Sequence, residues 1–361
     1  MFLKTYIRYI SKEFLETIIK VTFIFFSLIF ILTVFEELSF FKEAQVSFLY
    51  PIFLTFLNSP SILYDIFPFI FLISTQFFFI RIFEKNELSV YKNFGLNNFK
   101  ILKILTLVSL ILSLLIILLF YNFSAKFKFL YLDLKNNYAD DNKYLAVITE
   151  NGLWLKDEME ESILIVNAET IYENFLTEVS IVELTKNFEL IRNIEAEKVD
   201  IKNRKWRIYD AKQHINKNNI TSNEKELYLN TNFNLEKINS LFSNLSSLTM
   251  WELEKLKKDY ETLGYSTLEI NTHRHKIIAY PIYLMIMTLV SGIIMLNIKI
   301  NKSRIFNLIL GISLSVIIFY IQYFFNLLGE NGKIPVIMSI WFPLMILSIL
   351  SCIGLIRINE K

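Results

Sequence analysis

Long, almost uncharged runs occupy both ends of the chain. A helix that crosses a bilayer needs roughly 20 predominantly apolar residues. Six runs meet this need: residues 21–35 with about one more turn before them, about 59–82, 104–125, 277–298, 305–329 and 334–356. The pattern therefore predicts six membrane spans, three before and three after a long polar middle segment.

The middle segment, about 126–270, has short runs in which apolar and polar positions alternate. Such alternation, interrupted by Asn, Asp, Glu and Gly, is typical of strands. The runs are 144–149, 153–155, 162–166, 179–184, 199–201, 206–211 and 227–229. They predict an all-β sandwich or jelly roll. After them, Thr249 and Glu252 have the spacing of a capping box, which predicts an amphipathic helix that Gly264 ends.

Together these patterns predict an α-helical membrane protein of six transmembrane helices with an inserted all-β, jelly-roll-like domain. Its parts are an N-terminal transmembrane part (1–125), the β domain with its terminal helix (126–270) and a C-terminal transmembrane part (271–361). Composition agrees, because 53% of residues are hydrophobic and 16% are aromatic. The formal net charge of +2 gives no reason to expect nucleic-acid binding, and one cysteine excludes an internal disulfide.

A polar stretch at 81–100 separates the second and third spans, and it predicts a loop with a short helix at about 84–95 that Gly95 ends. Lys and Arg gather in this loop, near both termini and in the 299–304 loop. Basic loops mark the cytoplasmic side. We therefore expect cytoplasmic termini, an external β domain, and a loop that a soluble partner can bind. Glu87 is the expected contact residue, because it combines charge with expected exposure.

Four lysines follow the outer ends of spans one and three: Lys42, Lys126, Lys128 and Lys135. They could bind the anionic groups of an amphiphile whose chains lie among the Phe-rich spans. Ordinary interfacial anchoring is the alternative for each. Asp65 also lies near membrane depth, where an ionisable residue marks a candidate functional site; a solvated helix start, suggested by Pro60 and Pro68, is the alternative.

No catalytic, metal or cofactor site can be recognised in the sequence. The single Gly-Lys pair, Gly332-Lys333, lacks the upstream Gly and the Ser or Thr of a phosphate-binding loop, so it is interpreted as a turn. His273 and His275 have no recognisable third ligand and are interpreted as interfacial anchors. We expect no ATPase site, catalytic residue, metal or cofactor in this chain.

The order of several short motifs resembles the permeases of the lipopolysaccharide-export ABC transporter, of the LptF/LptG type. The motifs are Phe-Glu-Glu-Leu at 35–38, Asn-Glu-Leu-Ser-Val at 86–90 with Gly95, Gly-Leu-Trp-Leu-Lys-Asp at 152–157, Pro281, Gly311, and Trp-Phe-Pro at 341–343. The 152–157 and 341–343 motifs are more similar to the LptG subunit. The chain departs from the family at Tyr91-Lys92-Asn93-Phe94, where small and apolar residues are usual.

The resemblance implies a heterodimer with an LptF-type permease, a dimer of a separate LptB-type ATPase that binds the ATP, and LptC/LptA-type periplasmic bridge proteins. It implies that lipopolysaccharide is extracted from the inner membrane through a cavity lined by spans one, two and five. Coupling to the ATPase would then fall to a set in and beside the short helix: Glu84, Glu87, Leu88, Tyr91 and Gly95.

Two other functions are compatible with parts of this pattern. One is a mechanotransmission ABC protein, which relays ATP hydrolysis to an external partner and carries no lipid. The other is a membrane-anchored scaffold, although a scaffold needs only one or two spans.

Overall fold

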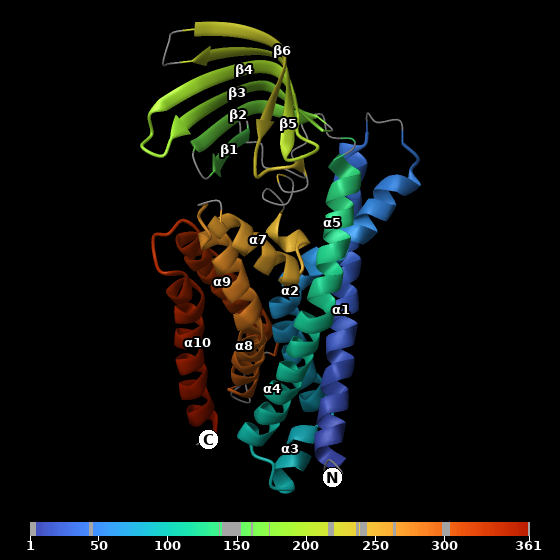
Figure 1. Ribbon diagram of the computed structural model, residues 1–361. Coiled ribbons are helices and arrows are strands. Elements are labelled where there is room, and N and C mark those ends of the chain that lie inside the picture. Colours follow the sequence, from blue (N-terminus) through green and yellow to red (C-terminus); the bar gives the residue numbers. More distant parts are fainter. Residues whose placement is uncertain are drawn as a thin grey trace. The chain divides into compact units, whose positions relative to one another are not determined.

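The computed structural model describes residues 5–42, 46–136, 138, 153–159, 162–172, 174–215, 220–235, 238, 244–262, 265–297 and 304–359. The chain divides into two compact units, one helical and one rich in strands (Figure 1). The helical unit combines Met1–Lys128 with Leu268–Lys361, and the β unit is Phe129–Thr267.

Among the described residues, six helices are long and apolar enough to cross a membrane, which confirms the predicted number of spans. They are α1 (Thr5–Phe40), α2 (Leu49–Glu84), the continuous run of α4 (Asn98–Leu115), a π-helical segment (Ile116–Tyr121) and α5 (Asn122–Asn136), then α8 (Leu268–Leu296), α9 (Arg304–Glu330) and α10 (Val336–Asn359). The strands lie between the third and fourth of these spans, as the sequence predicts.

Helices α2 and α8 form the centre of the helical unit. In their most apolar windows 61% and 56% of residues are buried, against 22% in α1 and α9. Short polar side chains join the helices across this centre: Ser109 Oγ lies 2.8 Å from Thr288 Oγ1, and Ser291 Oγ donates to the carbonyl of Leu72 at 2.7 Å. Small residues of this kind allow close helix packing where lipid provides no hydrophobic drive.

Helix α2 is longer than the predicted second span. Helix α2 begins at Leu49, about ten residues before the expected 59, and it contains Pro60 and Pro68. Proline removes an amide donor and leaves the carbonyl four residues earlier without its helical partner. At Pro68 this carbonyl belongs to Tyr64, and the Tyr280 hydroxyl of α8 donates to it at 2.5 Å. Neighbouring helices can thus keep a proline inside a membrane helix.

Asp65 therefore lies inside α2 and not at a helix start. Its carboxylate is 3.5 Å from the Lys276 ammonium of α8, and the two side chains are 53% and 44% exposed. The solvated-helix-start interpretation is wrong in its placement. The pair joins the two central helices.

Among its described residues, the β unit contains one six-stranded antiparallel sheet, which confirms the prediction of an inserted β domain. Its strands are β1 (Leu153–Glu158), β2 (Ser162–Tyr172), β3 (Phe175–Thr185), β4 (Leu190–Asp200), β5 (Lys205–Ile215) and β6 (Ile220–Asn230). They pair in chain order, so each strand lies beside its neighbours in sequence (Figure 1). Five of the seven predicted runs fall within these strands, and the run at 199–201 overlaps the end of β4. The run at 144–149 lies outside the described residues.

Two buried polar contacts hold the end of the sheet. The fully buried Trp206 donates its indole N–H to the carbonyl of Phe233 at 3.0 Å. Asp157, only 1% exposed, accepts from the backbone and side-chain amides of Asn232 at 2.7 and 2.8 Å. Buried polar groups are costly unless paired, so these bonds fix the chain that follows β6 against β1 and β5.

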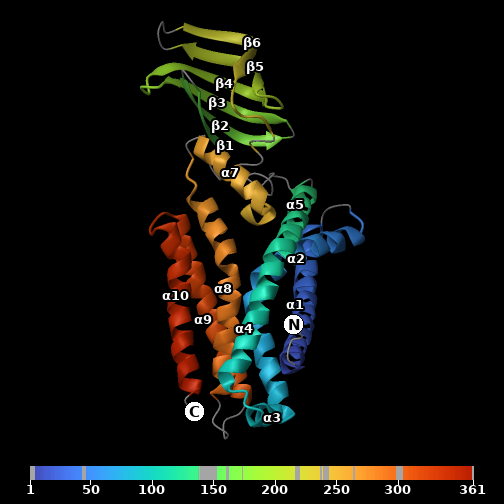
Figure 2. The same cartoon turned by 60° about the horizontal axis from the view of Figure 1, so that its bottom comes forward.

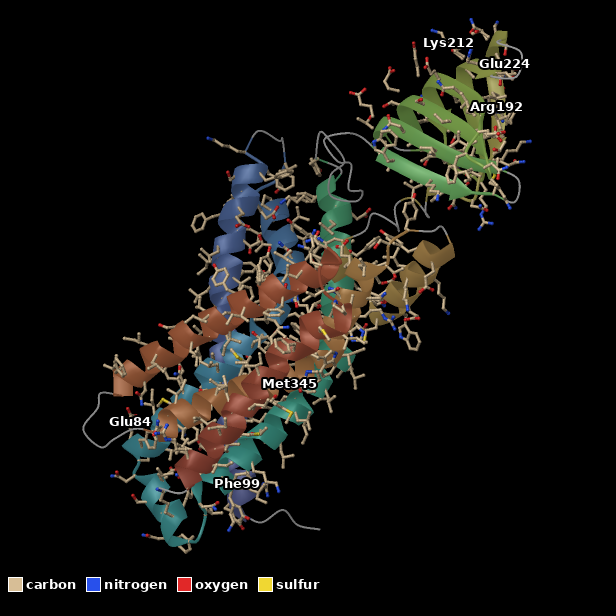
Figure 3. The ribbon with its side chains drawn as sticks, turned by 90° about the vertical axis from the view of Figure 1, so that its left-hand side faces the viewer. Glu84, Phe99, Arg192, Lys212, Glu224 and Met345 are labelled. Atoms are coloured by element: carbon tan, nitrogen blue, oxygen red, sulfur yellow. The ribbon has the colours of Figure 1, made fainter. Side chains whose placement is uncertain are left out.

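A polar chain also crosses β3 to β6. Arg192 contacts Glu183 at 2.5 Å and Gln213 at 3.4 Å, and Gln213 donates to Glu224 at 2.6 Å. Figure 3 labels Arg192 and Glu224 on this sheet. Cross-strand pairs of this kind stabilise a sheet and fix its register.

The predicted capping box is present at the start of α7 (Met250–Thr262). The Glu252 carboxylate accepts from the amide of Thr249 at 2.7 Å, and the Glu252 amide donates to the Thr249 hydroxyl at 3.4 Å. Gly264, expected to end this helix, lies outside the described residues.

Candidate functional site

The polar loop between α2 and α4 folds into a short helix, α3 (Glu87–Asn93). Gly95, with a φ of 78°, ends it: the Leu96 amide donates to the Tyr91 carbonyl and the Gly95 amide to the Lys92 carbonyl, both at 3.0 Å. This pair of bonds is the Schellman motif, which favours glycine at the left-handed position. Figure 2 shows α3 at the end of the helical unit where α2 ends and α4 begins.

Glu87 is held by residues of this chain. Its carboxylate accepts from the hydroxyls of Tyr9 in α1 and Tyr91 in α3, both at 3.0 Å, and lies 3.8 Å from the Lys85 ammonium. The Glu87 side chain is only 21% exposed, which is less than the sequence analysis expected. Burial and the neighbouring carboxylate raise the pKa of Tyr91, which keeps its hydroxyl protonated as a donor. Glu87 therefore links α3 to α1.

A second contact joins α1 to the end of α2. The Arg81 guanidinium lies 2.6 Å from one Glu13 oxygen and 3.3 Å from the other. A two-point contact fixes the orientation of an arginine as well as its distance. Helix α1 is thus connected to α2 and to α3 at the same end of the unit.

Two apolar side chains are exposed on α3 and its C-terminal turn, among the exposed polar ones. Phe94 is 82% exposed and Val90 is 49% exposed, and they are four residues apart. Residues at this spacing share one helix face. Among the coupling residues predicted from the sequence, Leu88 is half-buried, while Glu84 and Gly95 are exposed. Figure 3 labels Glu84. The available signal was the spacing of Val90 and Phe94, two apolar residues four positions apart.

The four lysines expected to contact lipid lie in different surroundings. Lys42 and Lys126 are exposed. Lys128 donates to the Asn58 side chain of α2 at 2.6 Å. Lys135 is only 7% exposed, in the β unit, and donates to the Tyr131 hydroxyl at 2.9 Å. The structure therefore leaves Lys42 and Lys126 as the exposed cations of this set.

The two histidines near the start of α8 are bonded to aromatic side chains. His273 Nε2 lies 3.2 Å from the Tyr121 hydroxyl, and the Trp341 indole N–H donates to His275 Nδ1 at 3.4 Å. Within the described part of the chain, no group of three His, Cys, Asp or Glu side chains is arranged to hold a metal.

Comparison with protein families adds the deciding observation. The family described as lipopolysaccharide export system permease LptF/LptG matches residues 8–357, nearly the whole chain. The chain belongs to this family. The match confirms the resemblance seen in the sequence and does not separate LptF from LptG. A comparison with curated proteins found no match.

Membership makes this permease a component of lipopolysaccharide export and a multi-pass protein of the inner membrane. Six apolar helices and the inserted sheet fit that role. The α3 region, the lysines and the Asp65–Lys276 pair are then candidate sites within a transport permease.

Proposed function

We propose that the permease converts ATP hydrolysis by a separate, LptB-type ATPase into extraction of lipopolysaccharide from the inner membrane. In this proposal it pairs with a second permease, and an ATPase binds the face formed by α3. The observation that carries the proposal is the connection of α3 and the end of α2 to α1, through Tyr9–Glu87 and Arg81–Glu13. Motion of α3 would therefore move a complete membrane helix.

The binding face and the connecting residue have different tasks in this proposal. Phe94 and Val90 provide the exposed apolar contact for the ATPase, since buried aromatic anchors dominate binding energy at interfaces. Glu87, with its two tyrosine donors, transmits the movement to α1. Packed helices shift as rigid bodies, so a small rotation of α3 would alter the space beside α1 and α2.

The orientation follows from the basic loops. Both termini and α3 lie in the cytoplasm in this proposal, where the ATPase finds ATP, and the β unit lies in the periplasm. There the β unit would pass lipid on to LptC/LptA-type bridge proteins. Lys42 and Lys126, the exposed cations of the predicted set, would bind the anionic groups of lipopolysaccharide.

The test separates coupling from binding. The permease is purified with its partner permease and the ATPase, and lipopolysaccharide released per ATP hydrolysed is measured for wild type, Tyr9→Phe and Glu87→Ala. Tyr9→Phe removes only the α1 donor to Glu87, so we expect the ATPase to stay bound while release per ATP falls. Tyr320→Phe, which changes a 64% exposed tyrosine of α9, is the matched control.

An unchanged release per ATP in both Tyr9→Phe and Glu87→Ala would contradict transmission through this contact. Loss of the ATPase from Tyr9→Phe would assign the contact to binding and would contradict the division of tasks.

A further inference from the structure

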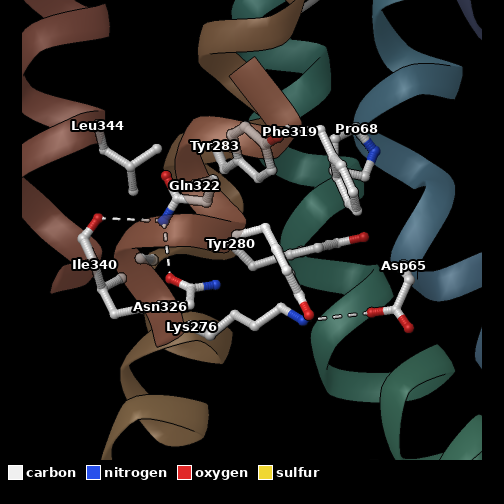
Figure 4. A pocket seen from close by; sticks show the side chains of 12 residues that line it. Asp65, Pro68, Lys276, Tyr280, Tyr283, Phe319, Gln322, Asn326, Ile340 and Leu344 are labelled. Carbon is white, nitrogen blue, oxygen red and sulfur yellow. Dashed lines mark hydrogen bonds and ion pairs between the residues drawn. The ribbon is translucent and has the colours of Figure 1, made fainter. Parts of the chain in front are cut away.

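A cavity of about 260 Å³ lies within the helical unit, between α2, α8, α9 and α10 (Figure 4). Aromatic and aliphatic side chains form most of its wall, among them Tyr280, Phe319 and Leu344. Drug-sized ligands occupy pockets of roughly 300–1,000 Å³. A whole lipopolysaccharide molecule, with its several acyl chains, is much too large for this space.

Two residues that line the cavity each carry a polar side-chain atom with no hydrogen-bond partner among the described residues. These atoms are the side-chain carbonyl oxygen of Gln322 and the hydroxyl of Tyr283, both fully shielded from solvent. Gln322 is only 9% exposed, and its amide nitrogen donates at 3.5 Å to the Ile340 carbonyl and to Asn326. An unpaired buried acceptor costs free energy, and a ligand that donates to it recovers this cost.

The charges at the cavity disfavour an ionic ligand. Its two charged lining residues are Asp65 and Lys276, and they are paired with each other at 3.5 Å (Figure 4). A ligand with a net charge would have to displace this pair or remain unpaired in an apolar space. The wall therefore favours a neutral molecule.

We propose that this cavity binds a small neutral amphiphile with one hydroxyl or amide group on a short hydrocarbon body. When the Gln322 amide or the Tyr283 hydroxyl turns toward the cavity, the ligand's polar group donates to the Gln322 carbonyl or accepts from the Tyr283 hydroxyl, and its chain fills the aromatic part. A volume of 260 Å³ equals roughly nine water-sized volumes of about 30 Å³. Octanol, with a matching number of heavy atoms, has the size and chemistry of the ligand class. This site does not depend on the proposed coupling mechanism.

The experiment uses two photoreactive probes, a diazirine-bearing octanol and the corresponding octane without the hydroxyl. The full-length permease in lipid nanodiscs is labelled with each, and labelled peptides are located and quantified by mass spectrometry. We expect octanol labelling at the cavity segments of α2, α8, α9 and α10, about tenfold stronger than octane labelling, since one recovered hydrogen bond has roughly that effect.

Gln322→Leu is the informative variant, because it replaces the unpaired carbonyl with an apolar group of similar size. We expect it to remove the preference for octanol over octane, and a thermal unfolding scan should show that the fold is kept. Tyr283→Phe tests the second polar atom. It replaces Gln322→Leu as the test of the octanol preference if that variant does not fold. Tyr320→Phe is the control, because Tyr320 lies on α9 but does not line the cavity.

The site is supported if octanol labelling concentrates at the cavity and its preference over octane disappears in Gln322→Leu or Tyr283→Phe. Labelling spread evenly over the lipid-exposed faces of α1 and α9 would overturn it. The same octanol-to-octane ratio in wild type and both variants would overturn it too, because the polar atoms would then take no part in binding.

Discussion

Replacing Phe94 with alanine is expected to weaken ATPase binding and leave the permease itself as stable as before. The Phe94 side chain is 82% exposed, so the folded chain loses little packing when it is shortened. Exposed substitutions of this kind change the free energy of unfolding by about 0.5 kcal/mol or less. The ATPase interface loses much more, because there the ring would be buried.

The size of the loss follows from the area involved. A fully buried aromatic side chain removes roughly 150 Å² or more from water, which at about 25 cal/mol per Å² is worth about 4 kcal/mol. Alanine retains part of that area. We therefore expect a loss of about 2–3 kcal/mol in binding free energy, or roughly a 30- to 150-fold higher Kd.

The assay measures binding of purified ATPase to the permease pair in nanodiscs by surface plasmon resonance. Phe188→Ala is the matched control, since Phe188 is 68% exposed and lies in the β unit. It should leave Kd unchanged. A Kd for Phe94→Ala within about twofold of wild type would refute the reasoning, because a change that small is about 0.4 kcal/mol and excludes a buried aromatic contact.

Three substitutions test the packing that positions these sites. Gly311→Ala should lower the melting temperature by the equivalent of about 1–3 kcal/mol, because its methyl carbon would lie 2.0 Å from the Gln76 amide nitrogen. Gly95→Ala should destabilise the end of α3 by about 1 kcal/mol through its φ of 78°, measured as faster hydrogen exchange there. Trp206→Phe should destabilise the β unit by about 1–3 kcal/mol by removing the donor to Phe233, measured by circular dichroism.

Each of these three predictions has a control variant or a result that would contradict it. Gly354→Ala places a methyl carbon 3.0 Å from a side-chain carbon of Ile293, so equal losses in Gly311→Ala and Gly354→Ala would contradict the close approach at Gln76. Gly95→Asn should recover part of the loss, since asparagine tolerates this φ; full stability of Gly95→Ala would contradict the strain. An unchanged β unit in Trp206→Phe would show that the indole bond contributes nothing.

Elements with a continuous pattern could be predicted from the sequence. Uncharged runs identified all six spans, and alternation identified strands in each of β1 to β6. The prolines of the second span misled: Pro60 and Pro68 suggested a helix start at Asp65, whereas α2 begins at Leu49 and continues through both. The Tyr280 hydroxyl compensates Pro68 by donating to the Tyr64 carbonyl, 216 residues earlier, and single-sequence patterns carry no information about such a partner.

Side-chain pairing across the chain was also beyond the sequence. Glu87 was chosen for its expected exposure, but Tyr9, 78 residues earlier, covers one of its oxygens. Lys135 was expected beside lipid, and its ammonium is instead buried against Tyr131. Both differences arise because a charge in a polar stretch looks the same in sequence whether water or another helix surrounds it.

Lipopolysaccharide extraction from proteoliposomes tests the central claim most directly. Vesicles contain lipopolysaccharide, the permease, its partner permease and the ATPase, and released lipopolysaccharide is measured with and without ATP. We predict release that requires ATP and the ATPase, persists in Phe188→Ala and falls strongly in Phe94→Ala. Release that is equal without ATP, or equal in Phe94→Ala and wild type, would contradict coupling of ATP hydrolysis to export through α3.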